Sequence, residues 1–374
     1  MEADLSNWRE SPHNVWAFHN IDKVLSTHPV KTGDATASIP SNDTRSFDGF
    51  QIQLSASPEL DLAGFQAVTK TDGMVVLHKG KIVHEFYDHG NERTSKHILM
   101  SMTKSVTGLV TGILASQGKF DVNKPIKHYV PEASSVFDSV TVQQCLDMNS
   151  GIKYNDGNHE YRAAAGWNPL RGDEAHKTLH DFLSHVEAAT DGPGAGFNYA
   201  SLNTDLLGWA LERATGKKLA ELISELLWQP MGAESDALVA VDSEGSARAA
   251  GGFCATVRDI ARIGQLVADG GRDIVPSSWI EDMMHHGDKD AFANGAWAPG
   301  FVGDLDSVAY RDCWLADSDT NVLCGLGIHG QMLVVDRTNN IVLAKTSSQA
   351  TAVDFGSVKM VVRAFKEFQR ILVD

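Results

Sequence analysis

The chain has 374 residues, of which 43% are hydrophobic and 21% charged, and its formal net charge is −16. A globular protein of this length can bury a large core, in one large domain or in two. The acidic balance, without any lysine- and arginine-rich run, makes nucleic acid and anionic membranes poor candidates as partners. Because no basic and apolar leader opens the sequence and no apolar run approaches membrane-spanning length, we expect a cytoplasmic protein with no membrane partner.

The N-terminal third passes from irregular sequence to β-structure and then to a helix. Residues up to about 65 are polar and irregular, with one helix expected near Trp16 to Ser26. Two β-rich runs flank Lys79-Gly80 and predict a hairpin over residues 73–87. The small and apolar residues after Ser101 predict a buried helix with this serine at its N-terminus, where the helix dipole favours negative charge.

The middle of the chain reads as helices and loops, and strands return near the C-terminus. Helices are expected at residues 142–148, 179–188, 204–215 and 219–229. Thr256 opens a further helix with a pattern like a capping box, which runs to about Ala268. Strands are expected from about Asn321 to Lys345, and an amphipathic helix over about residues 355–372 follows them.

Strands towards both ends and helices between them predict an α+β protein in two parts. Residues 1–120 plus 241–374 are expected to form an α/β domain, an antiparallel sheet flanked by terminal helices. Residues 121–240 are expected to form an inserted, all-helical domain. The helix that follows Ser101 would then lie at the junction of the two parts, a common place for a cleft.

Ser101-Met102-Thr103-Lys104 is the first of three elements that carry chemistry. A serine and a lysine three residues apart lie on one face of a helix, one turn from each other. A lysine kept away from water can lose its proton and accept one from the serine hydroxyl. Serine and lysine are common, so S-x-x-K also occurs by chance about once in a chain of this size, as an N-cap serine and a surface lysine. The pattern therefore needs partners elsewhere in the chain.

Tyr199-Ala200-Ser201 is the second element, and it follows the glycine-rich turn at residues 192–196. Just ahead of a predicted helix, the phenol of Tyr199 can relay a proton between serine, lysine and leaving group. A tyrosine that packs its ring and bonds to backbone is the plainer alternative. Tyr154 and Tyr161 lie in the expected cleft loop, and either could take this role if Tyr199 were buried away from the serine.

A glycine-bearing edge strand from Gly325 to Val335 is the third element, followed by a turn and a return strand from Ile341 to Lys345. Glycines in an edge strand let a ligand approach the backbone closely. One N–H of this strand and the N–H of Ser101 would form a two-donor oxyanion hole. The alternative is a plain hairpin whose glycines relieve crowding.

The order of the three elements resembles that of the serine β-lactamase and penicillin-binding-protein superfamily, in which S-x-x-K is a signature. Within it the chain is most similar to the 6-aminohexanoate-dimer hydrolases (nylon-oligomer hydrolases), relatives of class C β-lactamases and of the family VIII esterases on that fold. Matches in the same order run over most of the chain, at residues 8–18, 99–105, 129–132, 146–148, 165–167, 203–205 and 327–331.

The resemblance implies a β-lactamase/transpeptidase-like fold and assigns roles to individual residues. Ser101 would be the nucleophile, Lys104 its activating base and Tyr199 the proton relay to the leaving group. The backbone N–H groups of Ser101 and Ile328 would form the oxyanion hole, and Trp167 would lie along the substrate cleft. Neither a metal nor an organic cofactor is expected.

The chain departs from its relatives where substrates bind. Gly325-Leu326-Gly327 stands where the superfamily usually carries Lys-Thr-Gly, which favours an esterase or amidase over antibiotic hydrolysis. Compared with the nylon-oligomer hydrolases, the loop between Asp147 and Trp167 is shorter. The substrate-contacting positions fall on Arg162 and Ala250, with Tyr161 near a third and His329 as a further candidate.

We therefore predict a serine hydrolase that cleaves a small ester or short-chain amide through an acyl-enzyme. β-Lactamase or D,D-peptidase-like activity is one alternative, and a catalytically inactive binding protein on the same fold is another. Metal-dependent hydrolysis is disfavoured, because neither His285-His286 nor His159-Glu160 has the spacing of zinc ligands on one face. The sequence leaves a homodimer open.

Overall fold

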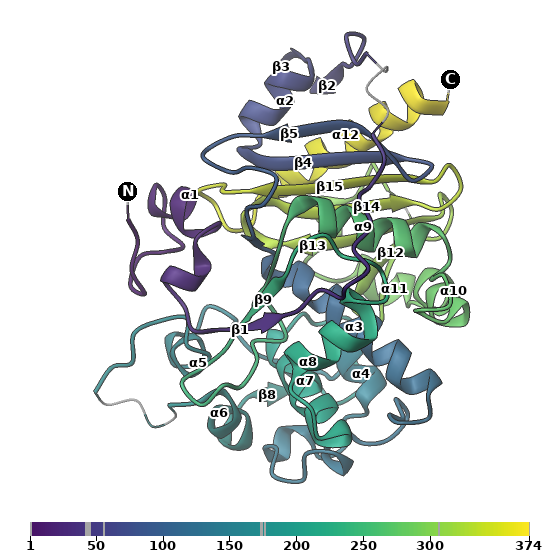
Figure 1. The fold of residues 1–374 in the computed structure, drawn as a ribbon. Helices are drawn as coiled ribbons and strands as arrows, with labels where there is room; N and C mark the ends of the chain where they lie inside the picture. The colour runs from purple at the N-terminus through teal and green to yellow at the C-terminus, as the bar shows by residue number, and fades with distance from the viewer. Residues whose placement is uncertain are drawn as a thin grey trace.

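The structure is a computed structural model that describes residues 2–41, 46–54, 57–172, 175, 177–305 and 307–373. Its largest element is a seven-stranded antiparallel sheet in the order β11-β12-β13-β14-β15-β4-β5, in the upper part of Figure 1. The strands are β4 (Thr71–His78), β5 (Lys81–Tyr87), β11 (Val308–Arg311), β12 (Trp314–Asp317), β13 (Val322–Gly327), β14 (Gln331–Asp336) and β15 (Ile341–Ser347).

Both faces of this sheet are covered by helices, which explains why its central strands β4, β14 and β15 are buried at nearly every position. On β4, Met74 and Val76 belong to the same core cluster as Phe365 and Phe368 of the C-terminal helix α12 (Phe355–Val373). The alternate residues of β4 belong to the other core cluster, with α9 (Val257–Ala268) and α3 (Thr103–Ser116). Helix α3 thus lies on the face of the sheet opposite α12.

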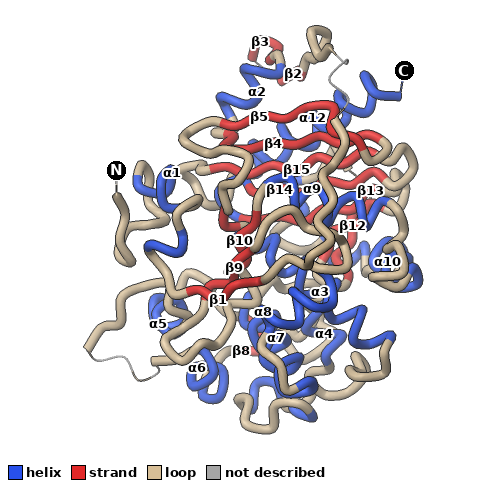
Figure 2. Tube along the Cα trace, in the orientation of Figure 1, coloured by secondary structure: helices blue, strands red, loops and turns tan. Residues whose placement is uncertain are grey.

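Further helices gather on the far side of α3, below the sheet in Figure 1 and in blue in the lower half of Figure 2. They are α4 (Val142–Leu146), α5 (His159–Ala164), α6 (Leu179–His185), α7 (Ser201–Thr215) and α8 (Leu219–Ile223). A second sheet, in the order β1-β9-β10-β6, consists of β1 (Thr27–Val30), β9 (Ala237–Ala240), β10 (Phe253–Ala255) and β6 (His97–Ile98). The remaining elements are α1 (His13–Ala17), β2 (Ile52–Leu54), β3 (Ser57–Leu60), α2 (Leu62–Val68), β7 (Ile152–Lys153), β8 (Ala189–Thr190), α10 (Ser277–His285) and α11 (Lys289–Ala293).

The structure confirms the α+β class and several elements, and it corrects others. The hairpin turns at Lys79 and Gly80, both with positive φ, and α12 ends one residue beyond the predicted helix. The helix expected near Trp16 to Ser26 is wrong: α1 ends at Ala17, and a single 3₁₀ turn follows. The strands β11 and β12 were not predicted. Among the described residues, no helix is long and apolar enough to cross a membrane.

The predicted glycine-bearing edge strand is two strands rather than one. The chain leaves β13 at Gly327, turns at residues 328–330 and returns as β14, and β13 is an inner strand of the sheet. The turn is sharp because His329 and Gly330 adopt positive φ angles of 62° and 92°. The pairing of β13 with β12 stops at Cys324, so its last residues have a locally free edge.

Candidate active site

The sequence places Ser101 at the start of a buried helix, and the fold brings the end of β13 directly against it. Ser101 lies in the 3₁₀ turn Met100–Met102 that leads into α3. A Cβ atom on Gly327 would come within 2.2 Å of the Leu99 carbonyl oxygen, and one on Gly325 within 2.9 Å of Ser105 Oγ. Only residues without a side chain permit this approach, which explains the glycines of the strand.

Lys104 is enclosed and makes three polar contacts. Its Nζ lies 3.1 Å from Ser101 Oγ, 3.0 Å from Ser201 Oγ and 2.8 Å from the Ala250 carbonyl oxygen. The side chain is 1% exposed, and this burial lowers the pKa of the ammonium group to about 7, although the charge of Asp156 acts in the opposite direction. A lysine with this pKa is substantially neutral at physiological pH and can act as a base.

Ser201 fixes the direction in which Lys104 can accept a proton. The Asp156 carboxylate accepts two hydrogen bonds from Ser201, one from its hydroxyl at 2.6 Å and one from its backbone N–H at 2.9 Å. Ser201 Oγ is therefore an acceptor towards Lys104, as is the Ala250 carbonyl. A neutral amine has two N–H bonds and one lone pair, so when both N–H bonds go to these acceptors the lone pair faces Ser101.

Tyr199 lies beside Ser101, and its ring lies over Lys104 with the ring centroid 4.8 Å from Nζ. The ring packs against Trp297, with their centroids 4.8 Å apart. Burial raises the pKa of the phenol, so it remains protonated at neutral pH and can donate to a leaving group. The structure thus brings Tyr199 to Ser101 and Lys104, from which it lies far apart in the sequence.

Two strained residues stand beside the two expected oxyanion donors. Met100, just before Ser101, has a φ of 51°, and His329, just after Ile328, has a φ of 62°. Non-glycine residues in this region cost about 1 kcal/mol or more, and they concentrate at functional sites. Ser101 and Ile328 each lie in the first turn of a 3₁₀ segment, where a backbone N–H has no acceptor within its own helix.

A buried ion pair between Asp205 and Arg248 helps to orient Lys104 through the peptide of Ala250. Asp205 pairs with Arg248, accepts the Tyr161 hydroxyl at 2.5 Å and accepts the Ala250 backbone N–H at 2.8 Å. Since the carbonyl of Ala250 accepts from Lys104, Asp205 holds one of the groups that orient the lysine. Tyr161 is fully buried and faces this ion pair, so the alternative in which it replaces Tyr199 finds no geometric support.

A cavity of about 290 Å³ opens in front of Ser101. Of the candidate substrate-contacting residues, Trp167, Arg162 and Ala250 line it, as does Ile328. Tyr161 and His329 do not line it, because Tyr161 is held by Asp205 and the His329 ring is 2.7 Å from the Gln349 carbonyl oxygen.

Several lining residues were not predicted. Asp156, Arg248 and Trp297 face the cavity together with Tyr154, for which the sequence suggests only a role as an alternative to Tyr199. Asp156 lies two residues from Tyr154 in the expected cleft loop, so its position could have been noticed. The Gly-Ala-Trp-Ala-Pro-Gly sequence around Trp297 predicts a turn and gives no sign of the cavity.

His285 and His286, one of the two residue pairs weighed as zinc ligands, do not line this cavity. His285 and His286 face carboxylates on the surface of α10, Glu281 at 3.4 Å and Asp282 at 2.9 Å. Within the part of the chain that the structure describes, no three histidine, cysteine or acidic side chains are placed to share a metal ion.

Comparisons with known proteins point to one family. The Beta-lactamase family model matches residues 62–364. A 6-aminohexanoate-dimer hydrolase of Paenarthrobacter ureafaciens is 34% identical over 361 residues, which are 93% of this chain and 88% of that protein. A Bacillus anthracis structure provisionally named as such a hydrolase superposes with a TM-score of 0.85 at 27% identity, over 98% of this chain and 97% of the other. A family VIII carboxylesterase has a TM-score of 0.59 at 18% identity, over 82% and 95% of the two chains, a likeness of fold alone.

Proposed function

Because this chain belongs to the β-lactamase family and is a serine hydrolase, we propose that Ser101, Lys104 and Tyr199 cleave a small ester or short-chain amide. The observation that carries the proposal is the arrangement around Lys104. A buried amine with two fixed acceptors directs its lone pair at a serine hydroxyl 3.1 Å away.

In the proposed reaction Ser101 Oγ attacks the carbonyl carbon while its proton passes to Lys104 Nζ. The tetrahedral oxyanion is held by the N–H groups of Ser101 and Ile328. As the C–O or C–N bond breaks, Tyr199 donates its proton to the departing alcohol or amine, and the proton on Lys104 restores the phenol. Water then attacks the acyl-enzyme, and the same groups return the proton to Ser101.

A fluorophosphonate probe tests this proposal directly. The purified protein is expected to gain the mass of one probe less HF, because fluoride leaves with the serine proton, and peptide mass spectrometry is expected to locate the adduct at Ser101. The same preparation is assayed with p-nitrophenyl butyrate, the 6-aminohexanoate linear dimer and nitrocefin. An inactive binding protein would give neither an adduct nor turnover, whereas nitrocefin turnover alone would favour β-lactamase activity.

The pH dependence of turnover follows from the state of Lys104. As the pH rises through about 7, the ammonium group loses its proton and the fraction of enzyme with a usable base increases. We expect kcat/KM for p-nitrophenyl butyrate to fall about tenfold per pH unit well below pH 7 and to level off above it. The readout is p-nitrophenol release at its isosbestic wavelength from pH 5 to pH 9. A rate that still rises tenfold per pH unit up to pH 9, as the ordinary lysine pKa of 10.5 would give, would contradict the lowered pKa on which Lys104 depends as the base.

A further inference from the structure

Three arginines surround Trp167 at one side of the cavity. The guanidinium carbons of Arg9 and Arg248 lie 5.8 and 5.0 Å from the centroid of the Trp167 ring. The backbone N–H of Trp167 donates to the backbone carbonyl of Arg162 at 2.7 Å. Both Arg162 and Arg248 line the cavity. In a chain with a net charge of −16, this concentration of cations is a local property of the site.

The carboxylates near these arginines are already engaged. Asp205 is paired with Arg248, and each oxygen of Asp156 accepts a hydrogen bond from Ser201. Over the described ranges, no ion pair reaches Arg9 or Arg162. Of the two arginines that line the cavity, Arg162 is the one without a paired carboxylate, although the charge of Asp156 acts on it.

Arg162 keeps most of its donors free. Its Nε donates to the Asp156 backbone oxygen at 2.8 Å, and its two NH₂ groups have no acceptor in the described part of the chain. A half-buried guanidinium presents these two groups in one plane, the geometry that binds both oxygens of a carboxylate.

The cations also disfavour one another. Burial, and then the charges of Arg162 and Arg248, lower the pKa of Arg9 to about 9. Burial and the charge of Arg248 likewise lower the pKa of Arg162, although the charge of Asp156 acts in the opposite direction. A negative charge that arrives with the substrate would offset this repulsion, whereas an ammonium group would add to it.

We propose that Arg162 binds a carboxylate of the substrate, so that the enzyme acts on esters or amides that carry a second, anionic group. The positive charges of Arg9 and Arg248 add to the attraction for this carboxylate. Trp167 provides an apolar surface for the part of the substrate that connects the carboxylate to the ester or amide. This proposal rests on the proposed function and adds the charge class of the substrate to it.

Matched substrates test the preference. On the acyl side, three p-nitrophenyl esters share the same five-methylene chain and end in a carboxylate (pimelate), a methyl group (heptanoate) or an ammonium group (6-aminohexanoate). On the leaving-group side, hexanoate esters of 4-hydroxyphenylacetic acid and of its methyl ester form a charged and neutral pair. We expect kcat/KM for the carboxylate member of at least one set to exceed that of its neutral partner about 10- to 100-fold, mainly through KM.

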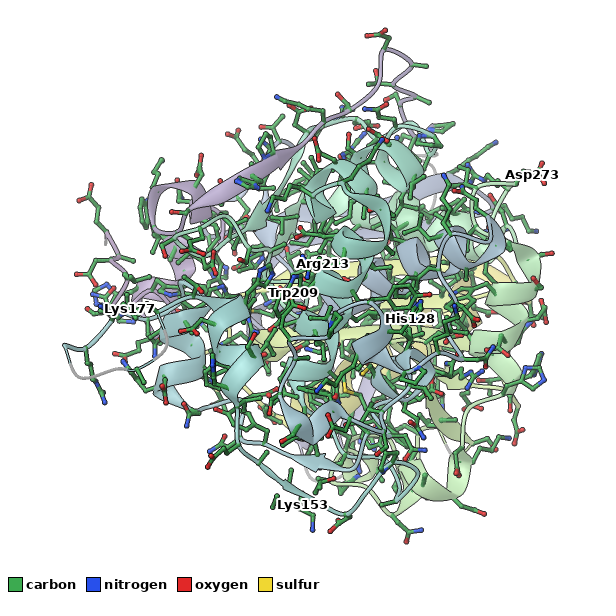
Figure 3. All side chains as sticks on the ribbon, turned by 90° about the horizontal axis from the view of Figure 1, so that it is seen from below. His128, Lys153, Lys177, Trp209, Arg213 and Asp273 are labelled. Atoms are coloured by element: carbon green, nitrogen blue, oxygen red, sulfur yellow. The ribbon has the colours of Figure 1, made fainter. Side chains whose placement is uncertain are left out.

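Three variants separate Arg162 from general electrostatics. Arg162→Gln is expected to bring the ratio of charged to neutral substrate close to one, and Arg162→Lys to restore part of it. Lys153→Gln is the matched control: this exposed lysine pairs with Asp191 at 2.7 Å and lies at the periphery of the molecule in Figure 3. Lys153→Gln also removes one positive charge but leaves the cavity unchanged, so the ratio of kcat/KM between charged and neutral substrates should remain at the wild-type value.

The proposal is overturned if both sets give ratios near one, if the ammonium ester is preferred, or if Arg162→Gln leaves the ratio unchanged. Failure of the proposed function looks different, because Ser101→Ala would then hydrolyse the neutral ester as fast as the wild type. In that case calorimetric titration of Ser101→Ala with monomethyl pimelate decides the charge preference: binding that Arg162→Gln weakens supports it, and no binding refutes it.

Discussion

Replacing Ser101 by alanine is expected to lower ester turnover by on the order of 10⁴-fold or more and to abolish labelling by a fluorophosphonate. The loss is this large because, in the proposed mechanism, Ser101 Oγ forms the acyl-enzyme, and only a residual rate remains without it. The fold should persist, since Lys104 keeps its contacts with Ser201 and Ala250. Steady-state rates, intact mass after labelling and the thermal midpoint measure the three effects.

Ser116→Ala provides the matched control for this experiment. Ser116 lies at the other end of the same helix, and its hydroxyl donates to the Ile113 carbonyl at 2.8 Å. This variant should be labelled and should turn over substrate like the wild type. An adduct that persists in Ser101→Ala, on any other residue, would show that the nucleophile has been misassigned.

Local geometry explains why part of the site could be predicted. The spacing of Ser101 and Lys104 places both on one helical face wherever the helix lies, and the apolar run after them indicates that the helix is buried. The low pKa of Lys104, by contrast, depends on segments distant in the sequence that bury it, such as those of Ser201 and Ala250. Asp156, which orients Ser201, approaches through a loop whose conformation is set by contacts distant in sequence.

The neighbours Tyr161 and Arg162 show a further limit of sequence reasoning. Adjacent residues on a helix point in different directions, so both could not share the cavity to the same extent. The structure turns Tyr161 towards Asp205 in the core and leaves Arg162 at the cavity. Without the rotation of α5, the sequence offered no way to choose between them.

The missed strands β11 and β12 have an equally specific cause. The residues that turn the chain between them, Asp312 and Cys313, have positive φ angles of 50° and 67° but are neither glycine nor asparagine. Tertiary contacts hold this turn: Asp312 donates its N–H to Asp147 at 3.0 Å and accepts from Gln143 at 2.7 Å. A local turn signal was therefore absent.

Replacing Asp205 by alanine is expected to destabilise the fold by about 3–5 kcal/mol, because it leaves the buried Arg248 guanidinium without a counter-charge. It also removes the acceptor of the Ala250 N–H, whose peptide orients Lys104, so kcat should fall as well. Denaturant unfolding followed by tryptophan fluorescence measures the first effect, and turnover at a temperature where the variant is folded measures the second.

A double variant separates the two causes of this loss. Most of the destabilisation in Asp205→Ala should come from the unpaired charge on Arg248 rather than from the lost hydrogen bonds, since an isolated buried charge costs more than a pair contributes. Asp205→Ala combined with Arg248→Met removes that charge and should recover a large part of the stability. Activity should not recover, because the Ala250 peptide still lacks its acceptor and Lys104 is still less well oriented. If the single and double variants were equally unstable, the ion pair would be only a minor contributor. If the double variant regained full activity, Asp205 would have no part in positioning Lys104.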